Sequence, residues 1–211
     1  MARPAPQSAL RFPLSAIFGT EANVRVLREL SQHGGQLTPS NLAARTKMTL
    51  PSVVASLRSL VDFNVLDERG TGRARLYSLN RTMPFYASIQ ALFDAEEARF
   101  TGIIGAVEDC AKSIGDAVIA SWAFGSVARG EDRAESDFDI AFIVNEEDVT
   151  SVQNRSIDFL SVSGREMMFS PSINTLSLND LRRLRDSNDP LWQAFLNEAL
   201  VIIGPRPDSI L

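Results

Sequence analysis

Apolar residues recur every three or four positions in three successive segments of the first sixty residues, which is the spacing of amphipathic helices. Thr38-Pro39 and Thr49 each have the form of an N-cap before a helix, and Gly34-Gly35 follows the first segment as a C-terminal cap. The pattern predicts three helices, over residues 21–33, 39–47 and 50–61.

The third predicted helix has one apolar and one polar face. Two β-compatible runs follow it, residues 65–69 and 73–79, and the turn Gly70-Thr71-Gly72 between them predicts a hairpin. The helix spacing places five residues inward, Val53, Val54, Leu57, Leu60 and Val61, and three outward, Ser52, Ser56 and Arg58.

A long connecting segment begins after Pro84 and keeps helical spacing of apolar residues to about Ala111. We expect one long helix here, with a break, if there is one, near Gly102 or Gly105. A helix of this length would lie across two domains or pack against a second copy of the chain. A homodimer is therefore expected.

The last hundred residues alternate between strand and helix patterns. Residues 117–124 form an apolar, β-compatible run that ends at the small-residue turn Gly125-Ser126, and a second strand is expected over residues 137–144. Later signals predict a helix over 148–160, a strand over 170–176, helices opened by Ser177 and by Asp189-Pro190, and a strand over 201–203. Trp192 and Phe195 are expected in the core of an α+β domain with a small mixed sheet.

Charge divides the chain into a basic and an acidic part. The whole chain has a formal net charge of −5. Residues 1–82 hold eleven Arg and Lys against five Asp and Glu, whereas residues 83–211 hold ten against twenty-one. A basic segment before an acidic one is typical of a module that binds a polyanion joined to a module that collects cations.

Composition indicates packed cores and excludes several classes. Apolar residues make up 45% of the chain and charged residues 22%, so wholesale disorder is not expected. Cys110 is the single cysteine, which excludes an internal disulfide, and no run of about 18 apolar residues predicts a membrane span. A cytoplasmic protein is expected.

Asp137 and Asp139 carry the candidate chemistry, because residues two apart in a strand lie on one face, about 6–7 Å apart. Two carboxylates at this spacing repel each other unless a cation lies near both, and oxygen ligands suit Mg²⁺ with phosphate. Gly125 lets the backbone approach a phosphate closely, and Ser126 adds a hydroxyl. These residues predict a site for Mg²⁺ and a nucleoside triphosphate.

Residues 15–82 resemble the winged helix-turn-helix domain of MarR- and ArsR-like bacterial regulators in the order of their elements. The resemblance implies binding of double-stranded DNA, with the third helix in the major groove and the hairpin, or wing, at the backbone. It implies base contacts by Ser52, Ser56 and Arg58, and phosphate contacts by Arg73, Arg75, Arg45 and Lys47. A role in protein interaction or dimerisation is the alternative for this domain.

The motifs Gly125-Ser126, Ala128-Arg129-Gly130 and Ser136-Asp137-x-Asp139 resemble the signature of minimal nucleotidyltransferases in the polymerase β-like superfamily. The resemblance implies metal binding and catalysis by Asp137 and Asp139, triphosphate contacts from Gly125 and Ser126, and an electrostatic or loop-shaping role for Arg129.

The later strand departs from the pattern of that superfamily. Active members usually carry a third carboxylate there, where it helps to activate the attacking hydroxyl. Here the corresponding position falls near Ser172 or Asn174, and neither residue is an acid. Asp158 could substitute, although its predicted helix favours a solvated surface charge.

Together these patterns predict a two-domain α+β chain. Residues 1–82 are expected to form the winged helix, 83–113 the connecting helix and 114–211 the nucleotidyltransferase-like domain. The predicted function is a DNA-binding regulator whose second domain binds Mg²⁺–NTP and, if it is an enzyme, transfers a nucleotidyl group to a hydroxyl. The alternative is a regulator without catalysis, in which a degenerate transferase domain senses nucleotide or mediates dimerisation.

Overall fold

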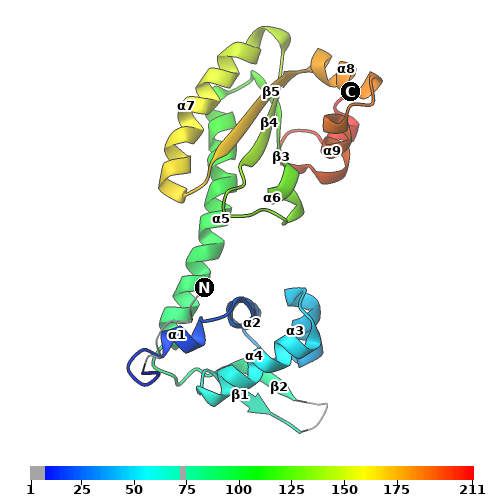
Figure 1. Cartoon of the computed structure of the whole chain (residues 1–211). Helices are drawn as coiled ribbons and strands as arrows, with labels where there is room; N and C mark the ends of the chain where they lie inside the picture. The colour runs from blue at the N-terminus through cyan, green and yellow to red at the C-terminus, as the bar shows by residue number, and fades with distance from the viewer. Residues whose placement is uncertain (1–7, 72–74) are drawn as a thin grey trace, which may run out of the picture. The chain divides into compact units, whose positions relative to one another are not determined.

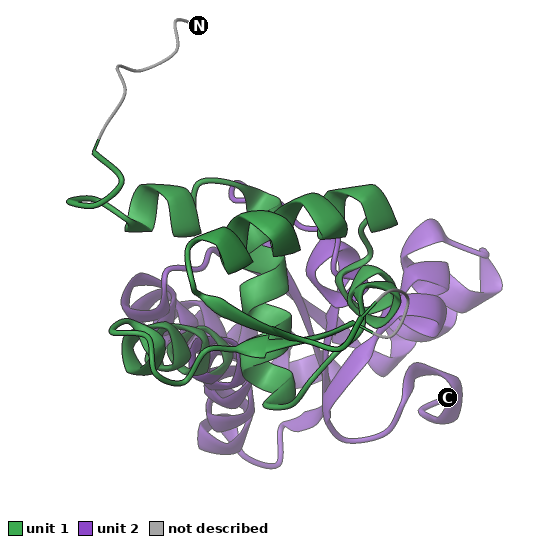
Figure 2. Ribbon diagram, turned by 90° about the horizontal axis from the view of Figure 1, so that it is seen from below, with its two compact units in different colours: residues 1–97 green, residues 98–211 purple. Residues whose placement is uncertain are grey.

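The computed structural model describes residues 8–71 and 75–211. The chain divides into two compact units, Met1–Glu97 and Ala98–Leu211, which Figure 2 shows in green and purple. Among the described residues, unit 1 has one hydrophobic core and unit 2 has two. Among the described residues, no helix is both long and apolar enough to cross a membrane.

Unit 1 consists of helices followed by a hairpin (Figure 1). A short helix that the sequence pattern did not predict, α1, precedes the three predicted ones, and the wing strands pair antiparallel with Leu66 opposite Leu79. The elements are α1 (Leu14–Ile17), α2 (Glu21–His33), α3 (Pro39–Thr46), α4 (Leu50–Asp62), β1 (Leu66–Arg69) and β2 (Leu76–Leu79). This order confirms the winged helix-turn-helix fold.

Local capping explains where the three main helices begin. The side-chain oxygens of Thr20, Thr38 and Thr49 each accept a hydrogen bond from a backbone N–H in the first turn of α2, α3 and α4. Gly34 ends α2 in the left-handed conformation, with φ of 68°. The predicted boundaries of these helices therefore agree with the structure to within one residue.

The connecting helix α5 (Tyr86–Ile114) is continuous. The break considered at Gly102 or Gly105 is therefore not present. A glycine inside a helix costs only about 1 kcal/mol relative to alanine, which packing on either side can offset. Ile89 and Phe93 of α5 pack in the core of unit 1, and Ile103 and Val107 pack in unit 2.

Unit 2 is a four-stranded mixed sheet with the strand order β5-β4-β3-β6. β4 and β5 are parallel, whereas β3 is antiparallel to both β4 and β6. The elements are β3 (Val118–Phe124), α6 (Gly125–Arg129), β4 (Phe138–Val144), η2 (Glu146–Asp148), α7 (Val149–Met167), β5 (Pro171–Ser177), α8 (Leu178–Asp186), α9 (Pro190–Glu198), β6 (Leu200–Ile203) and η3 (Pro207–Ser209). The small mixed sheet predicted from the sequence is confirmed.

Helices cover both faces of this sheet (Figure 1). Alternate residues of β4 pack in different cores: Ile140 and Phe142 lie with α5 and α7, whereas Ala141 and Ile143 lie with α8 and α9. Trp192 and Phe195 of α9 are buried in the second core, as predicted. The buried indole of Trp122 donates from Nε1 to the carbonyl of Pro205 at 2.9 Å, so its polar group is satisfied.

Cys110 gives a direct test of core packing. It is fully buried in the core of unit 2, and burial raises the pKa of its thiol to about 11. At pH 8 only about one molecule in a thousand then carries Cys110 as the reactive thiolate, and the surrounding side chains keep reagents away from it. We expect no reaction of the native protein with a thiol-specific disulfide reagent within minutes, and complete labelling in denaturant. Rapid labelling of the native protein would contradict this packing.

Candidate functional site

The centre of the candidate site is the contact between Asp139 and Gly125. Asp139 is the second residue of β4 and pairs with Phe124, the last residue of β3. Gly125 follows at once with φ of 75°, and a Cβ added there would collide with the Asp139 carboxylate. The absence of a side chain at position 125 therefore provides the space that this carboxylate occupies.

The residues after β3 form a short helix rather than the predicted turn. α6 spans five residues, and Gly130 ends it in the left-handed conformation with φ of 66°. Ser126 is half-buried in its first turn. Because the first backbone N–H groups of a helix have no partner within it, α6 presents donors beside the Asp139 carboxylate.

Asp137 differs from the prediction, because β4 begins at Phe138 and leaves Asp137 in the preceding loop. Its side chain is exposed, while that of Asp139 is half-buried. Strand alternation therefore cannot place the two carboxylates on one face, as had been expected. Asp137 lines a cavity of about 1040 Å³ instead.

This cavity lies beside the site and is bounded by the loop over residues 130–138, by α5 and by the end of α7. Its lining combines apolar side chains such as Phe100, Ile103 and Phe138 with charged ones of both signs, Arg165 and Glu135 among them. Its volume is at the upper end of the range for small-molecule sites. The cavity lining does not include Gly125, Ser126 or Asp139.

Arg129 is engaged with acidic neighbours. Its Nε lies 2.9 Å from Glu131 Oε2 and its Nη1 lies 2.6 Å from Glu198 Oε2. Hydrogen bonds from the guanidinium to Glu131, and then to Glu198, raise the pKa of Arg129 above its ordinary value. These contacts hold the end of α6 to the last residue of α9.

Ser172 is, with Asn174, one of the two β5 residues near which a third carboxylate was expected. It pairs in register with Asp139, and Leu176, four residues further along β5, packs with the α8–α9 core. By alternation, Ser172 and Asn174 share the sheet face of Asp139. Asp158 is exposed on α7, as predicted. In residues 8–71 and 75–211, no group of three or more Asp, Glu, His or Cys side chains could hold a metal ion.

On unit 1, the outward face of α4 differs from the prediction. Ser56 is buried, and its hydroxyl donates to Asn23 Oδ1 at 2.8 Å, so its expected outward position is wrong. Val54, expected inward, is 39% exposed. Ser52 and Arg58 are exposed as expected, although the Ser52 hydroxyl lies 2.9 Å from that of Thr49 within the N-cap of α4.

Two of the four residues predicted to contact phosphates, Arg45 and Arg75, are paired with acidic residues. Arg45 forms an ion pair with Glu29, and Arg75 Nη1 lies 3.0 Å from Glu68 Oε1. Lys47 is exposed in the turn between α3 and α4, with φ of 53°. Arg73 lies outside the described residues.

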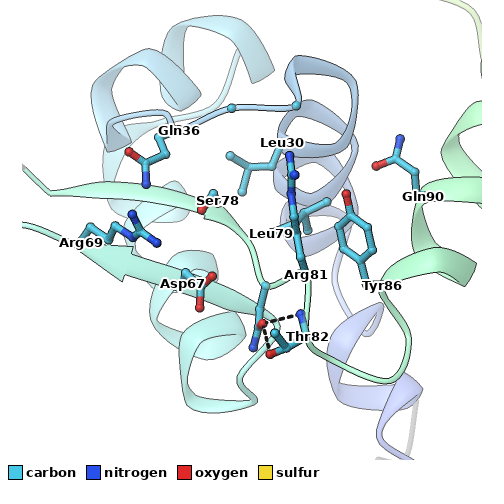
Figure 3. Close-up of a pocket in the computed structure, with 13 residues that line it drawn as sticks. Leu30, Gln36, Asp67, Arg69, Ser78, Leu79, Arg81, Thr82, Tyr86 and Gln90 are labelled. Atoms are coloured by element: carbon cyan, nitrogen blue, oxygen red, sulfur yellow. Dashed lines mark hydrogen bonds between the residues drawn. The ribbon is translucent and has the colours of Figure 1, made fainter.

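Sequence reasoning did not indicate a polar cavity of about 400 Å³ between the end of α2, the hairpin and the start of α5. Figure 3 shows the side chains that surround it, among them Gln36, Arg69, Arg81 and Tyr86. These residues come from separate elements of the chain, so no local motif could have grouped them. Gln36, Arg69 and Arg81 are exposed, and we assign no role to the cavity.

Comparison with known families identifies the class of the second unit. The family described as Polymerase beta, Nucleotidyltransferase matches residues 108–205. These residues therefore form a nucleotidyltransferase domain of the polymerase β type. No curated protein has a sequence that matches this chain.

Three solved structures are similar to parts of the chain. The AntR antimony-specific transcriptional repressor is 19% identical with a TM-score of 0.36, over 47% of this chain and 87% of that one. The winged helix-turn-helix domain of Mb0332 from Mycobacterium bovis, a possible ArsR-family regulator, is 20% identical with a TM-score of 0.32, over 45% and 88%. A toxin–antitoxin structure with AMP-PNP is 15% identical with a TM-score of 0.34, over 50% and 76%.

Proposed function

We propose that this protein is a cytoplasmic DNA-binding regulator whose nucleotidyltransferase domain binds a nucleoside triphosphate with Mg²⁺. The observation that carries the nucleotide half is the Asp139 carboxylate held against Gly125 at the first turn of α6. This places a candidate metal ligand next to backbone N–H donors that suit a phosphate.

The residues present fit a magnesium–triphosphate group. The donors are carboxylate and hydroxyl oxygens, which Mg²⁺ prefers, and the missing Cβ at Gly125 lets the Asp139 carboxylate lie against the backbone at the start of α6. Asp137 and Asp139 would hold the metal, and Ser126 with the first amides of α6 would bind the β- and γ-phosphates. The bound metal would neutralise negative charge on the phosphates. Arg129 would shape the loop, because two carboxylates already engage its guanidinium.

Transfer to an acceptor is the first of two candidate activities for this site. The oxygen of an acceptor hydroxyl would bond to the α-phosphorus and lose its proton to solvent water, the bond from that phosphorus to the bridging oxygen would break, and pyrophosphate would leave. Asp137 faces the large cavity, which offers space for a small acceptor. The acidic charge of residues 83–211 disfavours a large nucleic acid as that acceptor.

Nucleotide sensing without turnover is the second candidate. The two positions near which an acid would accept the proton of the attacking hydroxyl hold Ser172, in register with Asp139, and Asn174. A site with two carboxylates can still hold Mg²⁺–NTP without activating an acceptor. This candidate predicts that nucleotide changes the affinity for DNA without being consumed.

One experiment separates these candidates. The full chain is incubated with each α-labelled NTP and Mg²⁺, and bound nucleotide, released pyrophosphate and transferred label are measured. Pyrophosphate release or label transfer supports transfer. Binding without release supports sensing, and absence of binding to every NTP contradicts the nucleotide half of the proposal.

The proposal that the protein binds DNA is supported by the winged-helix element order and by the positive charge of residues 1–82. The third helix of the domain, α4, would enter the major groove, and the hairpin would contact the backbone. The protein would act as a homodimer, because two-fold operators match two-fold proteins.

The wing arginines give a test of DNA binding. We expect the double change Arg73→Ala and Arg75→Ala to weaken duplex binding and to reduce the slope of log K against log salt by roughly 0.9 for each phosphate that is no longer neutralised. A gel-shift series at several salt concentrations measures both effects. Arg182→Ala with Arg185→Ala on α8 removes the same charge from unit 2 and should leave the slope unchanged. An unaltered slope in the wing variant would contradict the assignment.

A further inference from the structure

The outward face of α4 is a stripe of apolar and small residues that begins at Leu50, with one cation, Arg58, and one acid, Asp62, at the end of the helix. Pro51, Val54, Ala55 and Arg58 are all exposed, and their spacing of three and four positions places them on one side of the helix. The opposite side is buried in the core of unit 1 through Val53, Leu57 and Leu60. The exposed stripe therefore takes no part in the packing of α4.

The two serine hydroxyl groups of α4 that were expected to contact bases, Ser52 and Ser56, are already engaged within the protein. The Ser56 hydroxyl is buried against Asn23, and the Ser52 hydroxyl is engaged with Thr49 in the N-cap. Arg58 forms no ion pair or side-chain hydrogen bond within residues 8–71 and 75–211. The outward stripe therefore presents methyl groups from Val54 and Ala55 and one free guanidinium.

The charges around the stripe favour a polyanion as its partner. Lys47 lies exposed just before α4, Arg58 lies within the stripe, and the basic residues of positions 1–82 outnumber the acidic ones by eleven to five. A protein partner for apolar residues would not need this excess of positive charge. Duplex DNA requires both charge neutralisation at phosphates and contact with base edges.

We infer that α4 reads thymine methyl groups through Val54 and Ala55, and an adjacent guanine through Arg58. This inference rests on the proposed DNA-binding function. In the major groove, thymine presents its C5-methyl group to apolar side chains, and guanine presents O6 and N7 to a bidentate arginine. Val54 and Arg58 are four residues apart, about 6 Å along the helix, which corresponds to about two base pairs. The recognised half-site therefore holds a thymine and a guanine within about three base pairs of each other.

Substitution of deoxyuridine for thymine tests the methyl contact, because it removes only that methyl group. The full-length protein is first used to select duplexes from a randomised pool. Each thymine of the selected half-site is then replaced singly by deoxyuridine. We expect about fourfold weaker binding at one or two positions, the effect of losing one buried methyl group.

Two variants assign the effect to residues. With Val54→Ala, the loss caused by deoxyuridine should shrink at one position, whereas Arg58→Ala should relax the preference for guanine and leave the deoxyuridine effect in place. Val162→Ala on α7 is the matched control, because Val162 is a similarly exposed valine in unit 2. Far-UV circular dichroism checks that each variant is folded.

The possible outcomes distinguish failure of this inference from failure of the proposed DNA-binding function. Salt-dependent duplex binding with no deoxyuridine effect at any position would overturn the methyl readout and leave DNA binding intact. Absence of duplex binding would overturn both. A change in the solution mass of Val54→Ala, with an unaltered deoxyuridine effect, would identify the stripe as a contact between protein chains and would also overturn the inference.

Discussion

Changing Asp139 to Asn should reduce Mg²⁺-dependent binding of nucleoside triphosphate by more than about 100-fold. The change keeps the shape of the side chain but removes the negative charge that would hold the metal, and such charge interactions contribute several kcal/mol. Titration calorimetry with each NTP, in the presence of Mg²⁺ and then of a chelator, measures the loss.

Asp158→Asn is the matched control for this change. Asp158 is an exposed carboxylate on α7, so the variant has the same net charge as Asp139→Asn without altering the site. It should bind nucleotide as the unaltered chain does. If both variants bound equally well, Asp139 would not be a metal ligand. Loss of binding in both would indicate that net charge, and not the site, controls affinity.

Changing Gly125 to Ala should both destabilise unit 2 and abolish nucleotide binding. The φ of 75° at this position disfavours any side chain by about 1–2 kcal/mol, and the new Cβ would also displace the Asp139 carboxylate. Chemical denaturation measures the first effect. Nucleotide titration of the folded variant measures the second, and we expect at least a tenfold loss of affinity from displacement of the ligand.

The variant Gly130→Ala separates the loss of stability from the loss of nucleotide binding. Gly130 also has a positive φ, 66°, but a Cβ there would meet no atom within 4 Å. This variant should lose similar stability through backbone strain and keep its affinity for nucleotide. Equal affinities in the two glycine variants would show that the space at position 125 does not matter for binding.

Local sequence signals predicted most of the helices and strands because short-range physics determines them. Thr38 and Thr49 cap their helices with their own side chains, and Ser177 with Asp180 forms the predicted capping box at the start of α8. Each of these signals needs only three or four neighbouring residues. The strands of the hairpin and of the mixed sheet were predicted for the same reason.

The errors on α4 arose from contacts that the local pattern does not contain. Ser56 was placed outward because serine is polar, yet Asn23, 33 positions earlier, supplies the acceptor that makes its burial favourable. Val54 and Ser56 are two positions apart on the helix and point about 200° away from each other, so Val54 is exposed where Ser56 is buried. Only the tertiary structure could reveal this exchange.

The sequence singled out the residues of the candidate site but did not indicate their local geometry. The motif indicated Gly125 and Asp139, and their contact depends on the register in which Phe124 pairs with Asp139. The start of β4 at Phe138, which separates Asp137 from the strand, was not evident from alternation alone. The engagement of Arg129 by Glu198 joins residues 69 positions apart, beyond any spacing rule.

The contact between Gly125 and Asp139 also constrains how this sequence can evolve. While position 139 holds a carboxylate, any residue larger than glycine at position 125 meets it, so substitution at one position alone is disfavoured. A lineage without the acid at position 139 is released from this steric conflict, although the positive φ still favours glycine or asparagine. Among natural relatives, side chains at position 125 should thus be confined to lineages without an acid at position 139, which would mark domains that no longer bind nucleotide.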